Sequence, residues 1–183
     1  MSAPTCTYKS VADGDLSGLT AACAVDRKVL VELLHDVDSG ARASPLCVAA
    51  EEGQLEVMEW LLRQPEVQVD HRGTIGGSSY TPLIVATEYG HVEAVRKLLE
   101  AGADLNTEDC GPWSPLYIAV EHRQPRCLEV LLAQPGIDFS RRGYRGTAHE
   151  LAVNMGEHQM AQQISLACSA AATSSLVKGS GQF

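Results

Sequence analysis

Histidine and cysteine are the side chains with which this sequence could bind a metal or carry out nucleophilic catalysis. The chain has 183 residues, among them six cysteines and six histidines. No two cysteines form a C-x-x-C pair, and no histidine stands at ligand spacing from a cysteine. No candidate nucleophile lies in a glycine-rich loop or a recognisable nucleophile turn. The sequence therefore predicts no catalytic residue, no metal site and no cofactor.

Composition and charge argue against several classes of partner. The net charge of −9 and the pI of about 5.1 oppose binding to a phosphate backbone. No apolar run reaches the roughly 18 residues that a membrane helix needs, and the first residues lack the basic start and apolar core of a secretory signal. Scattered cysteines in a chain of this size indicate reduced thiols. We therefore expect an intracellular protein, cytoplasmic, nuclear or both, that binds neither nucleic acid nor membrane.

One ten-residue pattern recurs along the chain and shows which elements would position any functional side chain. Its copies are "SPLCVAAEEG" from Ser44, "TPLIVATEYG" from Thr81, "SPLYIAVEHR" from Ser114 and "TAHELAVNMG" from Thr147, so that the starts are 37, 33 and 33 residues apart. A second apolar run follows each copy and ends at a matched position, namely Leu61-Leu62, Leu98-Leu99, Leu131-Leu132 and Ile164. Four copies with two features in register indicate a repeat protein.

The residues that the copies share predict a helix, a turn and a second helix in each repeat. The opening Ser or Thr suits a helix N-cap, and the proline that follows in the first three copies falls at the first helical position, as in Thr81-Pro82. The closing glycine, Gly90 in this copy, can take the left-handed conformation that ends a helix. The run "VEAVRKLLEAG" then has helical apolar spacing and closes at Gly102.

The stretch "TPLIVATEYGHVEAVRKLLEAGADLNTED" resembles an ankyrin repeat, whose pattern includes T-P-L-H-x-A and a period near 33 residues. The resemblance covers roughly residues 16 to 168. It implies an all-α solenoid of stacked helix-turn-helix units with short β-hairpin-like finger loops. It also explains His91 as the turn histidine of the pattern rather than as a catalytic base. Aromatic residues make up only 5% of the chain, which fits a core of Leu, Val and Ala between closely stacked helices.

The sequence departs from the ankyrin pattern at several positions. Arg123 stands where the other copies have a turn glycine, and Pro65 and Pro135 end helices where the middle copy has a glycine. The histidine of T-P-L-H is replaced in all four copies, by Cys47, Ile84, Tyr117 and Glu150. The usual hydrogen bond between the Thr and that His is therefore not expected.

We expect five modules between two tails. The first module, "GLTAACAVDRKVLVELL", places Ala21 and Leu33-Leu34 in register but lacks the T-P-L start. The predicted segments are an N-terminal tail (1–15), a degenerate N-terminal cap (16–43), three full repeats (44–80, 81–113 and 114–146), a C-terminal cap (147–168) and a disordered tail (169–183), the last judged from its small and polar residues.

The resemblance places the binding surface on the concave face, at the finger tips and the ends of the first helices. The residues expected at the finger tips precede each Ser/Thr start, and are Ala43, Tyr80, Trp113 and Gly146. The residues expected at the helix ends are Glu51-Glu52, Glu88-Tyr89, Glu121-His122 and Asn154-Met155. The predicted partner-binding residues are Tyr80, Trp113, Glu51, Glu52, Glu88, Tyr89, Glu121, His122, Asn154 and Met155.

Three glutamates in this set, Glu51, Glu88 and Glu121, form a column on neighbouring repeats. Like charges repel, and each Glu at a helix C-terminus opposes the helix dipole by roughly 0.3–1 kcal/mol. With aromatic residues alongside, the column suggests an acidic-aromatic groove for a basic peptide or loop, in which Trp113 or Tyr89 adds a cation–π contact. The alternative is that Glu is simply a common surface residue.

Three further features carry weaker predictions. The long connection at residues 71–79 is a partner-contacting loop or a tolerated insertion. The finger "SRRGYRG" contains Arg141, Arg142 and Arg145, which form a basic patch for an acidic surface or phosphate, or a solvated tip. Asn106 in "LEAGADLN" matches the pattern for asparaginyl hydroxylation in ankyrin repeats.

The function expected from these features is protein–protein interaction without catalysis, by a chain that is monomeric on its own. It would act as an adaptor or as a regulatory or inhibitory subunit. The alternative is a structural subunit of a large intracellular assembly. An enzyme would need a pocket with convergent titratable groups, for which the sequence offers no candidate. The fold class alone does not identify the partner.

Overall fold

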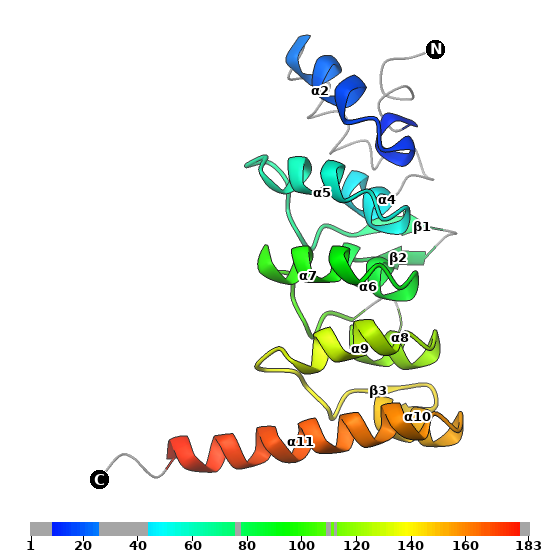
Figure 1. The fold of residues 1–183 in the computed structure, drawn as a ribbon, viewed down its shortest axis with the longest axis vertical. Coiled ribbons are helices and arrows are strands. Elements are labelled where there is room, and N and C mark those ends of the chain that lie inside the picture. The colour runs from blue at the N-terminus through cyan, green and yellow to red at the C-terminus, as the bar shows by residue number, and fades with distance from the viewer. Residues whose placement is uncertain (1–8, 26–43, 76–77, 109–110, 112, 180–183) are drawn as a thin grey trace.

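The computed structural model describes residues 9–25, 44–75, 78–108, 111 and 113–179. In this part of the chain, pairs of helices stack one above another into a single column (Figure 1). The first, or inner, helices of the repeats are α4 (Pro45–Glu51), α6 (Pro82–Glu88), α8 (Pro115–Glu121) and α10 (Ala148–Asn154). The second, or outer, helices are α2 (Leu16–Val25), α5 (Leu55–Leu62), α7 (Val92–Glu100), α9 (Pro125–Leu132) and α11 (His158–Gly179). From α4 onward each helix packs on its counterpart in the next repeat, which confirms the predicted all-α solenoid.

The N-terminus of each inner helix is set by its first side chain. The hydroxyls of Thr81 and Ser114 accept hydrogen bonds from the backbone N–H three residues on, at 3.5 and 3.3 Å. Thr147 makes a capping box with Glu150, whose carboxylate accepts from the Thr147 backbone. Ser44 occupies the N-cap position but makes no side-chain cap bond. A side-chain cap bond thus forms in three of the four copies and is missing at Ser44, although Ser44 precedes a proline as Thr81 and Ser114 do.

The turn between the two helices of a repeat has a residue in the left-handed region. The φ angles are 71° at Gly14, 66° at Gly53, 76° at Gly90, 54° at Arg123 and 76° at Gly156. Arg123 therefore adopts the conformation of the glycine that it replaces, at a steric cost that its Cβ imposes.

The residue that follows this turn joins each repeat to the preceding one. Its side chain donates a hydrogen bond to a backbone carbonyl at the end of the preceding inner helix. The three bonds are Gln54 Nε2 to Ala12 O (3.1 Å), His91 Nε2 to Glu51 O (2.8 Å) and Gln124 Nε2 to Glu88 O (3.0 Å). His91 is therefore structural, as the ankyrin resemblance implies, and the carbonyl partner requires its proton on Nε2.

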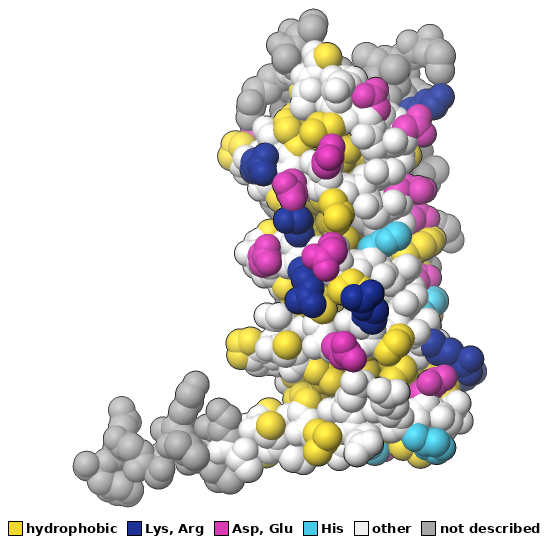
Figure 2. Space-filling model, in the orientation of Figure 1, with side chains coloured by type: hydrophobic (Ala, Val, Ile, Leu, Met, Phe, Trp, Pro, Cys, Tyr) yellow, Lys and Arg dark blue, Asp and Glu magenta, His cyan; other side chains and the backbone are white. Residues whose placement is uncertain are grey.

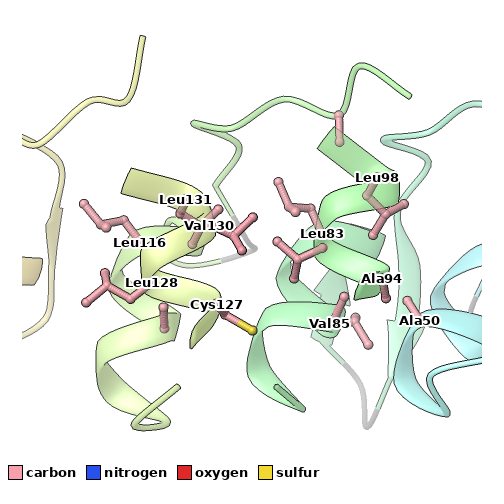
Figure 3. Packing of buried hydrophobic residues seen from close by; sticks show 14 of the residues in the cluster. Ala50, Leu83, Val85, Ala94, Leu98, Leu116, Cys127, Leu128, Val130 and Leu131 are labelled. Atoms are coloured by element: carbon pink, nitrogen blue, oxygen red, sulfur yellow. The ribbon is translucent and has the colours of Figure 1, made fainter. Parts of the chain in front are cut away.

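The core lies between successive layers of helices (Figure 3). Leu83 and Leu98 from one repeat belong to the same buried cluster as Leu116 and Leu128 from the next, and all four are at most 3% exposed. Small residues such as Ala94, which is fully buried, let neighbouring helices approach closely. Burying one leucine contributes roughly 1.5–3 kcal/mol, so the leucine layers fix the positions of the surface helix ends.

Two fingers contain short antiparallel hairpins. Strand β1 (Gly73–Ile75) pairs with β2 (Ser78–Tyr80), and β3 (Arg142–Gly143) pairs with β4 (Gly146–Thr147). The prediction of β-hairpin-like fingers is confirmed for these two loops.

The array begins earlier than the sequence suggested. Residues 9–13 are helical, Val11 is fully buried, and the Gln54 amide bonds to Ala12 O. These residues form the inner helix of the first module, and Gly14 is its turn. The predicted start at residue 16 and the tail over 1–15 are therefore wrong from residue 9 onward. Ala21 lies exposed on the outer helix α2 rather than in an inner helix, whereas Leu33-Leu34 lie outside the described residues.

The C-terminal segment also differs from expectation. The prediction of a disordered tail over 169–183 is wrong for residues up to Gly179, because α11 continues to that residue and projects beyond the stack (Figure 1). The segment "ACSAAAT" is rich in alanine, the strongest helix former, so a helix begun by packed residues such as Ile164 continues past the core. Residues 180–183 lie outside the described part.

Candidate partner-binding face

The predicted glutamates and their neighbours lie at the C-terminal ends of the inner helices. Tyr89 and His122 are the C-cap residues of α6 and α8, one position beyond Glu88 and Glu121. Because the inner helices stack directly, each helix end lies beside the end of the next. The side chains from neighbouring repeats therefore meet at this edge of the array.

Diagonal contacts, rather than a column of repelling glutamates, connect these helix ends. The Tyr89 hydroxyl donates to Glu51 Oε1 of the preceding repeat at 2.8 Å. One repeat further on, His122 Nε2 lies 3.9 Å from Glu88 Oε1 and forms an ion pair when the imidazole is protonated. We call Glu51, Tyr89, Glu88 and His122 the inner-helix ladder. Glu51 thus accepts a hydrogen bond and Glu88 has an imidazole within ion-pair distance, so the repulsion expected between the glutamates is offset at these two positions.

The ladder ends at the last repeat. The matching position there is Met155, whose thioether has no hydrogen to donate to Glu121. Asn154 is exposed beside it, and Met155 is partly buried. Within the described part of the chain, Glu121 thus has no counterpart of the contacts that Tyr89 and His122 make to Glu51 and Glu88.

Tyr89 is the most exposed aromatic side chain of the ladder, at 48% of its surface. The bond to Glu51, together with burial and the charges of Glu51, Glu88 and Glu52, raises the pKa of Tyr89 to about 12. Its ring lies parallel to that of His91, with centroids 6.4 Å apart. The ring is therefore held in place with three carboxylates around it.

Tyr80 and Trp113 lie away from the ladder. They precede the N-termini of α6 and α8, whereas Glu88 and Glu121 end these helices, roughly 10 Å away at 1.5 Å per residue. A cation–π contact at Trp113 within the glutamate column is therefore wrong as a prediction. Trp113 instead contacts Tyr144 edge-on, with centroids 5.5 Å apart at 85°.

The finger tips are not where the sequence placed them. Tyr80 pairs with Gly73 at the base of its hairpin, and Gly146 pairs with Gly143 beside the turn rather than in it. Tyr144 and Arg145 form the tip of the last finger, and residues 76–77 of the long connection, like Ala43, lie outside the described residues. The Ser/Thr starts in the sequence predict where each inner helix begins. They do not predict which residues pair across the hairpin that precedes it.

The arginine-rich finger is not a uniform basic patch. Arg141 pairs with Glu108 and with Asp138, and Arg142 Nη2 lies 3.2 Å from Glu150 Oε2. Within the described residues, no carboxylate lies within ion-pair distance of the Arg145 guanidinium. One cation of the three is therefore available at this tip.

Asn106 has a structural role in the connection between repeats. Its Nδ2 donates to Gly136 O at 2.9 Å, and its Oδ1 accepts from Asp138 N at 2.8 Å. Both ends of the amide are therefore engaged with the next repeat.

The described residues give little support for catalysis. They contain no group of three or more His, Cys, Asp or Glu side chains that could hold a metal ion. Burial raises the pKa of Cys47 to about 12 and that of Cys127 to about 11, so both thiols stay protonated and unreactive at neutral pH. Among the helices described, none is both long and apolar enough to cross a membrane.

Comparison with known proteins agrees with the helix pairs, turn residues and fingers described above. A family model of ankyrin repeats, in three copies, matches residues 46–143, which is more than half of the chain. The chain belongs to the ankyrin repeat family.

The relatives of this ankyrin repeat chain share the repeat segment. The human transient receptor potential cation channel subfamily A member 1 is 37% identical over 98 residues, 54% of this chain and 9% of that protein. Human ankyrin repeat and SOCS box protein 11 is 38% identical over 106 residues, 57% of this chain and 30% of that protein. Palmitoyltransferase AKR1 of Lachancea kluyveri is 34% identical over 91 residues, 50% of this chain and 12% of that protein.

The ankyrin chain spans at most 30% of the length of these three relatives. Their names describe a channel, a SOCS box protein and a palmitoyltransferase, so what they share with this chain is the repeat array and not one activity. Ankyrin repeats form a non-catalytic fold that binds other proteins. The chain is therefore a protein–protein interaction module.

Proposed function

We propose that this chain is an adaptor or a regulatory subunit whose inner-helix ladder binds a basic segment of a partner protein. The observation that supports this most directly is the environment of Tyr89. The ring is half exposed, the Glu51 bond fixes it, and the charges of Glu51, Glu52 and Glu88 all act on it. A lysine or arginine placed over such a ring gains a cation–π contact as well as charge attraction.

The carboxylates of Glu52 and Glu121 belong to the same surface as Tyr89. Glu52 is exposed and lies beside Glu51 at the end of α4. Glu121 receives no hydrogen bond from Met155 of the next repeat, so a cation from a partner supplies the missing counter-charge. A methionine next to it packs against aliphatic stems of different shapes, because its side chain is flexible and polarisable. The ladder therefore offers acidic groups on both sides of an aromatic ring.

The cysteines support an intracellular location, which is part of the proposal. The Cys47 thiol lies 3.5 Å from Tyr80 O and is fully buried. Like Cys23, Cys127 and Cys168, it is a free thiol rather than part of a disulfide, as is usual in a reducing compartment.

A pair of charge reversals tests the proposed function. Glu52→Lys places a cation beside the ladder, whereas Glu56→Lys makes the same change on the outer helix α5, and both side chains are exposed. We expect Glu52→Lys to reduce capture of the cellular partner about tenfold or more, and Glu56→Lys to leave it within about twofold, since tenfold corresponds to about 1.4 kcal/mol. Equal capture by the two variants would rule out the ladder as the binding surface.

A further inference from the structure

The last repeat leaves a surface uncovered that every inner repeat buries. The residue six positions after each Ser/Thr start is Ala50, Thr87 or Val120 in the inner repeats, and each is fully buried. The next inner helix packs against the helix that carries this residue in each case. The matching residue of α10 is Val153, which is 48% exposed. This end face is what a further repeat would cover.

Polar residues replace the apolar residues of the inner repeats at only part of this end face. His149 stands where the inner repeats have a buried leucine such as Leu116, and Glu150 stands where they have buried residues such as Tyr117. Terminal repeats need a polar outer face, and these two changes provide one. Val153 and the finger-tip Tyr144, which is 75% exposed, remain apolar.

A shallow hollow of about 520 Å³ lies between the finger and α10, lined by Arg142, Tyr144, Arg145, His149, Glu150 and Val153 together with Gly146 and Asn154. Basic, acidic and histidine side chains appear together at this end of the array (Figure 2). Along the outer helices α5, α7 and α9 in the same view, acidic and basic side chains alternate.

The charges of the hollow leave one cation to be matched. Arg142 and Glu150 pair with each other at 3.2 Å, and Glu150 also accepts from the Thr147 backbone at 2.9 Å. The Arg145 guanidinium has no carboxylate partner in the described part of the chain, and its backbone N–H donates to the Tyr117 hydroxyl at 3.3 Å. Contact with Trp113 orients Tyr144. The hollow thus presents a free guanidinium beside an ordered phenol ring and an exposed valine.

We propose that this end face docks a segment of a partner protein that carries a carboxylate next to an apolar side chain. The carboxylate pairs with Arg145, for which a two-bond geometry is available, and the apolar side chain packs on Tyr144 and Val153. Tyrosine and arginine are the residue types that most often dominate binding energy at interfaces. An acidic segment fits here, whereas a basic segment fits the inner-helix ladder, so the two surfaces bind opposite charges independently of each other.

A second copy of the chain fits this face less well. A symmetric pairing of two end faces would bring Arg145 of each copy together, and juxtaposed like charges oppose association. The carboxylate that lines the hollow, Glu150, is already paired with Arg142. The unmatched charge therefore favours an acidic partner over self-association.

The test selects peptides from a random library displayed on phage against the immobilised chain of 183 residues. We expect one class of selected peptides to carry Asp or Glu next to an aliphatic or aromatic residue. Arg145→Glu should weaken the affinity of synthetic peptides from this class about tenfold or more, and Tyr144→Ala and Val153→Asp should weaken it as well. Arg96→Glu makes the same charge change on the outer helix α7, where Arg96 is exposed, and should leave the affinity within about twofold.

Three results would overturn the proposal. The first is the absence of an acidic class among the selected peptides. The second is equal binding by Arg145→Glu and Arg96→Glu, with circular dichroism showing that both variants are folded. The third is a dimer of the chain alone in sedimentation that Arg145→Glu dissociates, which would assign the face to a second copy. A basic class of peptides that is sensitive only to Glu52→Lys tests the ladder separately, so failure of one proposal is distinguishable from failure of the other.

Discussion

The Tyr89 hydroxyl donates a 2.8 Å hydrogen bond to the carboxylate of Glu51 in the preceding repeat. The two residues are 38 positions apart in the sequence and belong to adjacent layers of the array. The bond ties two repeats together at the edge where we place partner binding. Its loss should therefore affect the stability of the array.

Tyr89→Phe removes this bond and retains the ring. A hydrogen bond to a charged group contributes roughly 1.5–3 kcal/mol when shielded, but Tyr89 is half exposed and solvent screening reduces the effect. We expect the free energy of unfolding in urea to fall by about 0.5–1 kcal/mol. Tyr144→Phe, at a phenol that is 75% exposed, is the control and should change it by less. Equal effects of the two variants would contradict an ordered Tyr89–Glu51 bond.

The same bond predicts a pH dependence of stability. The pKa of Tyr89 is raised from its ordinary value of 10 to about 12. The folded state therefore holds this proton more tightly than the unfolded state does. Its contribution is fully present below pH 10 and is lost as the pH rises toward 12. Denaturant titrations across this window should show a steeper loss of stability for the wild type than for Tyr89→Phe. Parallel curves would be evidence against the raised pKa.

The bond from His91 to Glu51 O provides a test of how repeats are joined. His91→Ala leaves this partly buried carbonyl without its donor and should lower the free energy of unfolding by about 1 kcal/mol. His91→Gln should restore most of the loss, because Gln54 and Gln124 make the same bond in neighbouring repeats. Thermal or urea unfolding of the three proteins gives the comparison. A glutamine variant no more stable than the alanine variant would show that the bond does not join the repeats.

Variants of Arg123 distinguish the effect of backbone strain on stability from the effect of an ion pair. Its left-handed φ of 54° costs a residue with a Cβ roughly 1–2 kcal/mol, while its exposed ion pair with Glu157, at 3.1 Å, contributes at most about 1 kcal/mol. The freedom that glycine gains in the unfolded chain offsets part of the relief. We expect Arg123→Gly to be about 0.5 kcal/mol more stable than the wild type in urea unfolding. Arg123→Ala keeps the strain and loses the pair, so it should be the least stable of the three.

The end of α11 is helical without packing into the core. Ala170 and Ala171 are exposed, and each replacement of Ala by Gly in a helix costs about 1 kcal/mol locally. The double Gly variant should therefore exchange the amide protons of residues 169–179 faster, while the midpoint of global unfolding stays unchanged. A large shift of the midpoint would show that this segment packs on the repeats.

The parts of the fold that were predictable from the sequence depend on local chemistry. The Ser/Thr-Pro-Leu starts and the turn glycines encode helix ends within a few residues, and Thr81 and Gly90 behave as their types require. The first module lacks this start, so its inner helix was missed. The run from Gly14 to Leu19 could have revealed it, because Gly14, Leu16 and Leu19 align with Gly53, Leu55 and the buried Met58.

The contacts within the candidate site are harder to predict from the sequence than the positions of its residues along the helices. The sequence places Glu51 and Tyr89 correctly at helix ends, but the diagonal offset that pairs them is set by how the layers stack. The finger tips depend on hairpin register, which shifted the expected tip from Gly146 to Tyr144 and Arg145. The alanine-rich tail was misjudged because small residues were treated as disorder-promoting, although alanine favours helix.

The most direct measurement of the central claim replaces Tyr89 with a photo-reactive phenylalanine analogue in the native cell. After irradiation, mass spectrometry identifies the partner peptide that is joined to position 89. The same probe at Glu56, on the outer helix α5, is the control. We predict crosslinks from position 89 to a partner segment rich in lysine or arginine, and few or none from position 56. Crosslinks from position 56 alone, or from position 89 to segments without a basic residue, would contradict a ladder that binds basic partners.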